Sequence, residues 1–352
     1  MFPLVGNQSV NENGFWENLK FPTTATAFRR LGVALGQMVP PSGKFLLAAD
    51  SQSLRAELVL KFIDGLRFSG AAVVDIGFLP IPMVYYAARR TRADGCAILS
   101  TSYDSADVNV DLKWLIGETV PDLSQLERLQ KAVSQSESSG SRRKDAPDIR
   151  FLDVTFDYVA WLQDTWFDSP GRHGHVILDS CDGPWANRSR RYMQAVFPRL
   201  VFSDMSDEPE RAKSIEEEVD HRRAELGITL GVDGGQISLV DGHGIPYSHD
   251  ELNWLLIQSF GHSLEGEVFL HDTECPPLIL SEAVRFGAKL QGIPPGDVSF
   301  RRAMMETSAI FGAESTGHHY FRAICGNNDA LFSACWILDF LAQSGQSLAQ
   351  FR

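Results

Sequence analysis

One short loop carries three side chains that suit the recognition of a sugar. Glu314, Thr316 and His318 occupy every second position of the run Ala-Glu-Ser-Thr-Gly-His. A carboxylate accepts hydrogen bonds, a hydroxyl donates and accepts, and an imidazole does either according to its tautomer. Glu314 and His318, four residues apart, therefore supply an acceptor and a donor or acceptor suited to hydroxyl groups. The alternative interpretation is a surface loop with an exposed histidine.

Ser102 and Lys113 are candidates for phosphoryl chemistry. Ser102 lies in a Ser-Thr-Ser run, and a serine acts as a nucleophile only when a base or a metal activates it. Lys113 has the charge to neutralise a phosphate. Each residue also fits an ordinary polar position in contact with solvent.

Asp233 and Arg301 are the remaining candidates for binding charge. Asp233 begins an Asp-Gly-Gly run, and one carboxylate leaves most of a Mg²⁺ coordination shell to water. The same run fits an Asx turn. Arg301, followed by Arg302, has the planar guanidinium that binds phosphate through two hydrogen bonds. Two adjacent arginines also fit the solvated face of a helix.

The elements that must carry these residues alternate between strand and helix in the first third of the chain. Apolar runs at 44–49, 71–76 and 95–99 fit buried strands, and apolar residues recur at helical spacing over 51–68. The third strand is expected to end before a polar loop at 100–104. Repeated strand–helix–strand units predict an α/β layered fold.

Two boundaries divide the chain into three predicted domains. The Ser-rich stretch 134–145 fits a solvated linker, with a regulatory or phosphorylated segment as the alternative. A second pattern follows, with a charged helix at 215–226 and a strand at 228–232, and the chain closes with an apolar helix at 329–343. The predicted domains are 1–148, 149–248 and 249–352.

The composition is that of a globular protein with a surplus of acidic residues. The 352 residues include 32 Lys and Arg and 45 Asp and Glu, which gives a formal net charge of −13. Because a protein that binds the phosphate backbone normally presents a basic face, no nucleic-acid partner is expected. Small anionic ligands remain compatible, since a local pocket can oppose the global charge.

Neither a membrane span nor a secretory signal is predicted. The best candidate span, 70–88, contains Asp75, Pro80 and Pro82, and the N-terminal run MFPLVGNQSVNENGF lacks a basic region followed by an apolar one. The five cysteines are scattered and form no CxxC pair, so neither a disulfide framework nor a zinc knuckle is expected. These features favour a cytoplasmic protein without membrane partners.

Three loops, in this order along the chain, resemble those of the α-D-phosphohexomutase family, the phosphomannomutases and phosphoglucomutases. That family has a serine loop of the form T-A-S-H-N-P-x-x-Y-N-G-x-K after the third strand of its first domain. Here the same place contains Ser102, which falls on the phosphoserine position, with Lys113 shortly after it. The preceding strand–helix–strand sequence matches the family in pattern, and the resemblance covers nearly the whole chain.

The other two loops are similar to the family's metal loop and sugar-recognition loop. The D-G-D-G-D-R metal loop corresponds to GVDGGQ at 231–236, in which only the middle aspartate, Asp233, is kept. The G-E-x-S-G-H loop corresponds to AESTGH at 313–318, which keeps the glutamate and the histidine and has Thr316 for the serine. Arg301 corresponds to a lysine of the family.

The resemblance implies phosphoryl transfer between the 1- and 6-positions of a hexose. A phosphoserine carries the group, and a divalent ion neutralises charge. It also implies three consecutive phosphohexomutase-type α/β domains, with mixed sheets and flanking helices. The family's fourth domain, which grips the substrate phosphate, is expected to be absent because the chain ends before it. Given the altered metal loop, we expect no cofactor, or Mg²⁺ if the protein is active.

Three functions remain open at this point. The first is a catalytically impaired member of the family that binds a hexose phosphate or acts as a regulator or scaffold in carbohydrate metabolism. The second is an active mutase, an intramolecular phosphotransferase, whose altered site is completed by a partner chain. The third is a structural module in which a protein partner or homo-oligomer covers the surface that the fourth domain occupies in the family.

Overall fold

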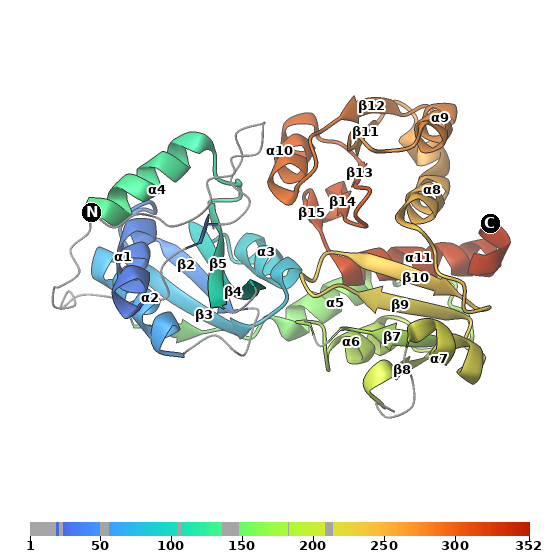
Figure 1. Cartoon of the computed structure of the whole chain (residues 1–352), viewed down its shortest axis with the longest axis horizontal. Coiled ribbons are helices and arrows are strands. Elements are labelled where there is room, and N and C mark those ends of the chain that lie inside the picture. Colours follow the sequence, from blue (N-terminus) through green and yellow to red (C-terminus); the bar gives the residue numbers. More distant parts are fainter. Residues whose placement is uncertain are drawn as a thin grey trace. The chain divides into compact units, whose positions relative to one another are not determined.

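A computed structural model gives the arrangement of the chain (Figure 1). It describes residues 19–20, 24–49, 56–104, 107–135, 148–181, 183–207 and 214–352. The N-terminal run and most of the predicted linker at 134–145 lie outside the described residues. The chain forms two compact units, Met1–Val154 and Thr155–Arg352. The domain boundaries at 148 and 248 stay predictions.

The first unit is built on one mixed six-stranded sheet, in the order β1-β5-β4-β2-β3-β6. β2 is parallel to β3 and β4, and β3 is parallel to β6, whereas β5 is antiparallel to both β4 and β1. The strands are β1 (Leu19–Lys20), β2 (Lys44–Ala49), β3 (Ala72–Phe78), β4 (Gly95–Asp104), β5 (Asp107–Ile116) and β6 (Arg150–Phe151). The helices are α1 (Ala25–Gly36), α2 (Ala56–Ser69), α3 (Ile81–Arg90) and α4 (Leu123–Gln135).

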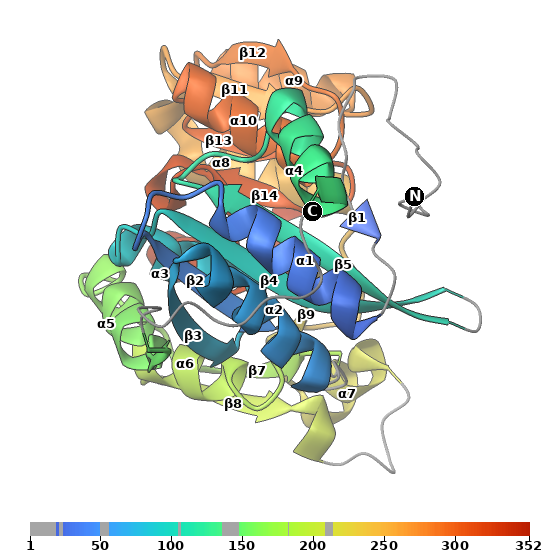
Figure 2. The same ribbon diagram turned by 90° about the vertical axis from the view of Figure 1, so that its left-hand side faces the viewer.

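Both faces of this sheet are buried, as its continuous apolar strands require. Successive side chains point to opposite faces, so Phe45 and Leu47 pack with α1, α2 and α4 in one core. Leu46 is equally buried, and α3 contacts β2 and β4. Figure 2 shows α1 and α2 lying over the strands. The predicted α/β layers are confirmed in this unit.

The strand that contains Ser102 is longer than predicted. A polar loop was expected at 100–104, but β4 continues to Asp104 and pairs with β5 along its whole length, ending with Asp104 opposite Asp107. The prediction was wrong because it judged the strand by its apolar residues. A backbone ladder also forms between polar residues when a neighbouring strand supplies the partners.

The second unit begins with a four-stranded sheet in the order β10-β9-β7-β8. Its strands are β7 (Gly174–Asp179), β8 (Leu200–Asp204), β9 (Leu226–Leu230) and β10 (Ile237–Asp241), with helices α5 (Thr155–Thr165), α6 (Ser189–Val196) and α7 (Ile215–Arg222). The helix predicted to reach residue 226 ends at Arg222. Arg223 adopts the left-handed conformation, with φ 50° and ψ 43°, which stops a helix and lets β9 start early.

A five-stranded sheet follows in the same unit, in the order β12-β11-β13-β14-β15. Its strands are β11 (Val268–His271), β12 (Lys289–Gly292), β13 (Phe311–Ala313), β14 (His319–Phe321) and β15 (Asn327–Asn328). The helices are α8 (His249–Phe260), α9 (Pro277–Arg285), α10 (Asp297–Thr307) and α11 (Ala330–Ser344). Ser248 and Glu251 form a capping box that starts α8.

The closing helix α11 joins the two sheets of the second unit. It contacts α6, α8, β9 and β10. Its Phe332 stacks on Trp161 of α5, with ring centroids 5.7 Å apart, and meets Phe321 of β14 at 5.1 Å. Large aromatic side chains bury much apolar area in such contacts, so α11 holds α5 and both sheets around one aromatic core.

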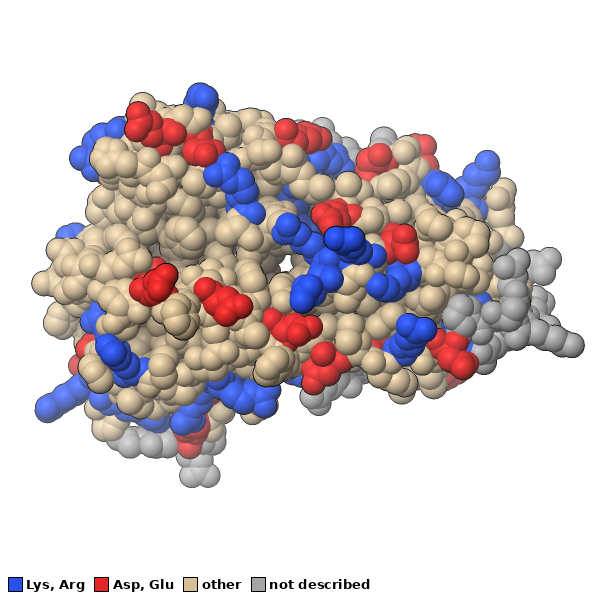
Figure 3. All heavy atoms as spheres, turned by 180° about the vertical axis from the view of Figure 1, so that it is seen from behind, with Lys and Arg blue, Asp and Glu red and all other residues tan. Residues whose placement is uncertain are grey.

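The surface carries charges of both signs. On the face drawn in Figure 3, Lys and Arg side chains are interspersed with Asp and Glu side chains, and neither sign covers it continuously. None of the helices in the described ranges has the length and apolar character needed to span a bilayer.

Candidate functional site

The structure places the predicted site residues in both units. Ser102 lies on β4, opposite Asn109 of β5, and Lys113 lies on β5 opposite Ile98. The side chain of Ser102 is outside what the structure describes. The other candidates belong to the second unit. They are Asp233, Arg301, Glu314, Thr316 and His318.

Two hairpin turns bring Asp233 and His318 together. Asp233 lies in the turn between β9 and β10, which are antiparallel with Leu230 opposite Ile237. His318 ends the turn between β13 and β14, where Ala313 is opposite His319. Gln236 of the first turn forms a β-bridge with His318 of the second. The loops that resemble the metal loop and the sugar loop are therefore in direct contact.

A short hydrogen bond connects the two turns. His318 Nε2 lies 2.6 Å from Asp233 Oδ2. Gln236 Nε2 also donates to the carbonyl of Thr316, at 2.6 Å, and the backbone N–H of Ile237 donates to the carbonyl of Gly317. These bonds fix the sugar loop against the β9–β10 turn through backbone and side chain alike.

Glu314 lies inside the sugar loop rather than on its surface. It is 3% exposed and accepts hydrogen bonds from the backbone N–H of Gly296, from Tyr320 Oη at 3.2 Å and from Thr316 Oγ1 at 3.3 Å. Thr316 is exposed, and the His318 side chain is 20% exposed. Thr316 is thus the most exposed residue of the loop, and His318 is partly exposed.

A buried aspartate supports the same loop from beneath. Asp272, which follows β11, is 1% exposed. Its Oδ2 accepts from both the N–H and the hydroxyl of Ser315, each at 2.7 Å, and its Oδ1 accepts from the N–H of Glu274. His249 of α8 lies 2.9 Å from the carbonyl of Ser315. Such a set of buried bonds holds the loop in one conformation.

The ionisable side chains of the site shift one another's pKa values. Burial alone would raise the pKa of Asp233, but the hydrogen bond and charge of His318 and two backbone N–H groups hold that pKa well below its ordinary value. Burial opposes charge on His318, yet Asp233, Glu314 and Asp297 together raise its pKa. Burial raises the pKa of Glu314 despite its hydrogen bonds. The Asp233 carboxylate therefore favours the protonated form of His318, and His318 favours the ionised form of Asp233.

The β9–β10 turn does not fit a divalent cation. Its Asp233 uses Oδ1 for the N–H groups of Gly235 and Gln236, at 3.0 and 3.1 Å, and Oδ2 for His318. Gly231 and Gly235 offer no side-chain oxygen. Mg²⁺ and Ca²⁺ need several oxygen ligands with free lone pairs. Among the described residues no three His, Cys, Asp or Glu side chains gather in a manner suited to a metal.

Arg301 is buried on α10 rather than presented to solvent. It is 5% exposed, and its Nη1 lies 3.9 Å from Asp297 Oδ2. The alternative of a solvated helix face does not hold for this side chain. A phosphate could reach its guanidinium only if α10 or the loop before it moved.

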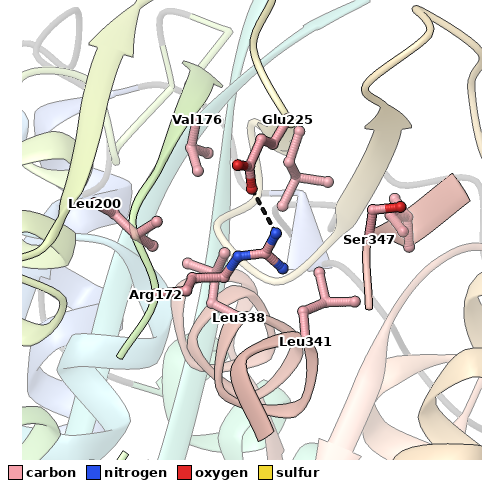
Figure 4. A pocket seen from close by; sticks show the side chains of 9 residues that line it. Arg172, Val176, Leu200, Glu225, Leu338, Leu341 and Ser347 are labelled. Atoms are coloured by element: carbon pink, nitrogen blue, oxygen red, sulfur yellow. Dashed lines mark hydrogen bonds and ion pairs between the residues drawn. The ribbon is translucent and has the colours of Figure 1, made fainter. Parts of the chain in front are cut away.

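A separate pocket in the second unit lies outside these loops. It is a small cavity of about 10 Å³ between the four-stranded sheet and the end of α11 (Figure 4). Leucine and valine side chains dominate its wall, and Arg172 pairs with Glu225 at 2.5 Å and donates to the carbonyl of Gln346. A cavity with room for roughly one water molecule, and with its cation already neutralised, is a poor site for a sugar phosphate.

Several residues of the loop network were missed by the sequence interpretation. They are Asp272, Asp297, Gln236, His249 and Tyr320. Asp272 had a usable signal, because it is a polar residue directly after a buried strand. Asp297 and Tyr320 had none, since their proximity to Glu314 follows from the packing of α10 on the sheet.

Comparison with known proteins identifies the family. Phosphoglucomutase/phosphomannomutase models match twice, with alpha/beta/alpha domain I over residues 7–128 and alpha/beta/alpha domain III over residues 249–352. These segments are the sheet that carries Ser102 and the sheet that carries the sugar loop. The chain belongs to the α-D-phosphohexomutase family, and the resemblance drawn from the three loops is confirmed.

The individual relatives are distant. The phosphomannomutase/phosphoglucomutase of Pseudomonas aeruginosa is 23% identical, and the match covers 97% of this chain and 72% of that protein. The phosphoglucosamine mutase of Nitrosomonas europaea is also 23% identical, over 94% of this chain and 77% of that protein. Both relatives belong to the same family and are equally similar to this chain, one being a phosphomannomutase/phosphoglucomutase and the other a phosphoglucosamine mutase.

Solved structures agree on the fold. A phosphoglucomutase/phosphomannomutase family protein from Burkholderia thailandensis superposes with a TM-score of 0.82 at 20% identity, covering 95% of this chain and 78% of that one. An Aspergillus fumigatus N-acetylphosphoglucosamine mutase, in complex with GlcNAc-6P and magnesium, gives 0.61 at 10% identity over 93% and 79%. The predicted phosphohexomutase-type α/β fold is confirmed.

Proposed function

We propose that this chain is a member of the phosphohexomutase family that binds a hexose phosphate without metal-dependent phosphoryl transfer. The observation that carries the proposal is the hydrogen bond between Asp233 and His318. This bond occupies the one carboxylate kept in the metal loop, and the sugar loop keeps its conformation against the β9–β10 turn. Relatives that bind a sugar phosphate, such as the Aspergillus enzyme with GlcNAc-6P, support the class of ligand.

The charges around the loop favour the sugar ring over its phosphate at this place. Asp233, Asp297 and Glu314 surround His318, so the cluster carries more negative than positive charge. A dianionic phosphate next to it would be repelled. Neutral hydroxyl groups suit the exposed Thr316, which His318 holds through its Nδ1 while its Nε2 is bonded to Asp233. We therefore expect the loop to contact ring hydroxyls, with the phosphate held away from it.

Removing these two side chains is expected to weaken binding. In calorimetric titrations of glucose 1-phosphate and mannose 1-phosphate without Mg²⁺, Thr316→Ala/His318→Ala should lose at least about tenfold in affinity relative to the unchanged chain, since each lost hydrogen bond contributes roughly 1 kcal/mol. His243→Ala, which removes an exposed imidazole elsewhere in the unit, is the matched control. Glu314→Ala is a poor test, because it empties a buried position.

The titrations also separate the alternatives. Equal affinities in the double variant and in the unchanged chain would contradict a ligand at this loop. No binding of either sugar phosphate at millimolar concentration would contradict the proposal and favour a scaffold, with a protein partner or a second copy as the ligand. Binding that needs Mg²⁺ would favour the active mutase completed by a partner chain.

A further inference from the structure

The β9–β10 turn has glycines, Gly231 and Gly235, at the two positions where the family's metal loop has its other aspartates. A Cβ atom at Gly235 would lie 2.7 Å from Asn328 Nδ2, and one at Gly231 would lie 2.9 Å from Gln236 Cβ and 3.2 Å from Asp233 Oδ1. Real Cβ atoms essentially never lie closer than 3.0 Å to another atom. A side chain at Gly235 or Gly231 would thus require Asn328 or Gln236 to shift.

The hydrogen bonds around His318 are complete when its ring carries both protons. Nε2–H then donates to Asp233 Oδ2, and Nδ1–H donates to Thr316 Oγ1, 2.9 Å away. The Thr316 hydroxyl is left free to donate to Glu314 Oε2. The short contact requires a proton on Nε2, because the Asp233 carboxylate only accepts. The geometry therefore makes His318 a donor to Asp233.

We propose that the loop corresponding to the family's metal loop acts in this chain as a positioning element for the sugar loop, with Asp233 hydrogen-bonded to His318 rather than to a divalent cation. Asp233 is then a positioning residue, because it acts on a ligand only through His318. The inference goes beyond the proposed function and stands without it, since the Asp233–His318 contact exists without any sugar.

The ionisable groups around His318 come from five elements. Asp233 belongs to the β9–β10 turn, Glu314 to the sugar loop and Asp297 to the start of α10, and all three favour the charged ring. His319 of β14 and His249 of α8 are the nearby basic groups. His319 is buried, and burial, with His318 and His249 beside it, lowers its pKa to about 3, so it stays neutral. Asp233 forms the shortest contact with His318 in this set.

The test is ¹⁵N NMR of the histidine rings in the full chain. In the unchanged chain His318 Nε2 is expected to carry the proton that it donates to Asp233 Oδ2, and in Asp233→Asn, whose Nδ2 takes that place and cannot accept, the Nε2–H signal is expected to be lost. The fold should persist, since an asparagine Oδ1 still accepts from Gly235 and Gln236. Asp164→Asn, an exposed carboxylate on α5, should leave His318 unchanged. An unchanged His318 in Asp233→Asn would overturn the positioning role.

The metal part of the inference has its own readout. Mn²⁺, a paramagnetic substitute for Mg²⁺, is expected to leave the His318 ring signals as sharp as those of His243, an exposed histidine. Gly235→Asp, which restores one carboxylate to the turn, should not create selective broadening, because Asn328 occupies the space. Selective broadening of His318 in the unchanged chain, lost in Asp233→Asn, would show that the turn binds a cation and would overturn the proposal.

Discussion

The chain is expected to convert glucose 1-phosphate to glucose 6-phosphate at least about a thousandfold more slowly than a metal-dependent relative, because losing a single charge contact in a transition state costs roughly 10²–10³ in rate. Phosphoryl transfer depends almost entirely on positioning and on charge neutralisation. Here Asp233 is committed to His318 and to two backbone N–H groups, and Gly231 and Gly235 supply no ligands.

A coupled assay for glucose 6-phosphate measures this, with Mg²⁺ and catalytic glucose 1,6-bisphosphate present. The Pseudomonas aeruginosa phosphomannomutase/phosphoglucomutase is the positive control. Ser102→Ala separates true turnover from contamination. Conversion at a rate similar to the control, and its loss in Ser102→Ala, would contradict the expected loss of phosphoryl transfer. That result would favour an active mutase whose site is completed by a partner chain.

The largest effect on stability is expected at a buried pair that joins the two halves of the second unit. Tyr158 Oη of α5 donates to Asp329 Oδ2 at 2.5 Å, and Asp329 Oδ1 caps α11 by accepting from the N–H of Phe332. Both residues are buried. Tyr158→Phe should lower the free energy of unfolding by about 1.5–3 kcal/mol, the range for hydrogen bonds to charged groups.

The chain supplies a matched control for this substitution. Tyr192 is as buried as Tyr158 and its ring lies 6.4 Å away, but its hydroxyl has no hydrogen-bond partner among the described residues. Tyr192→Phe should therefore leave the unfolding free energy unchanged or raise it, because it removes a buried hydroxyl that has no partner among the described residues. Equal losses in the two variants, measured by urea denaturation, would contradict a special role for the Tyr158–Asp329 bond.

Asp329 also makes stability depend on pH. Burial raises its pKa from 3.8 to about 6, and the hydrogen bonds from Tyr158 and the helix only partly offset this. A folded carboxyl with a raised pKa holds its proton more tightly than the unfolded chain, so its contribution to stability is present below pH 3.8 and is lost as the pH rises through 6. The unchanged chain should lose up to about 3 kcal/mol relative to Asp329→Asn over this range. A difference independent of pH would contradict the assignment.

Much of this architecture was predictable because it follows from local patterns. The apolar run at 44–49 coincides with β2, and the apolar helix predicted at 329–343 corresponds to α11, with Asp329 as its cap. The loop 313–318 was identified from its residue types, and it is the turn between β13 and β14. Burial, helical periodicity and turn chemistry are all readable within a short window of sequence.

The contacts that decide the function were not predictable in this way. Asp233 and His318 are 85 residues apart, and Tyr158 and Asp329 are 171 apart. Each pair depends on where two sheets and α11 place their turns and helices. Glu314 was interpreted as a sugar ligand because its type and spacing fit, but residue type does not report burial. Only the packing of α10 and β14 shows that Glu314 is enclosed.

The Mg²⁺ dependence of hexose-phosphate binding tests the central claim most directly. Glucose 1,6-bisphosphate would be titrated into the full chain by calorimetry, once with Mg²⁺ and once with EDTA. Because Asp233 is hydrogen-bonded to His318 rather than to a divalent cation, the two dissociation constants are expected to agree within about twofold, well under the roughly tenfold change that about 1.4 kcal/mol of metal contribution would produce. Binding that appears only with Mg²⁺, and disappears in Asp233→Asn, would contradict the account.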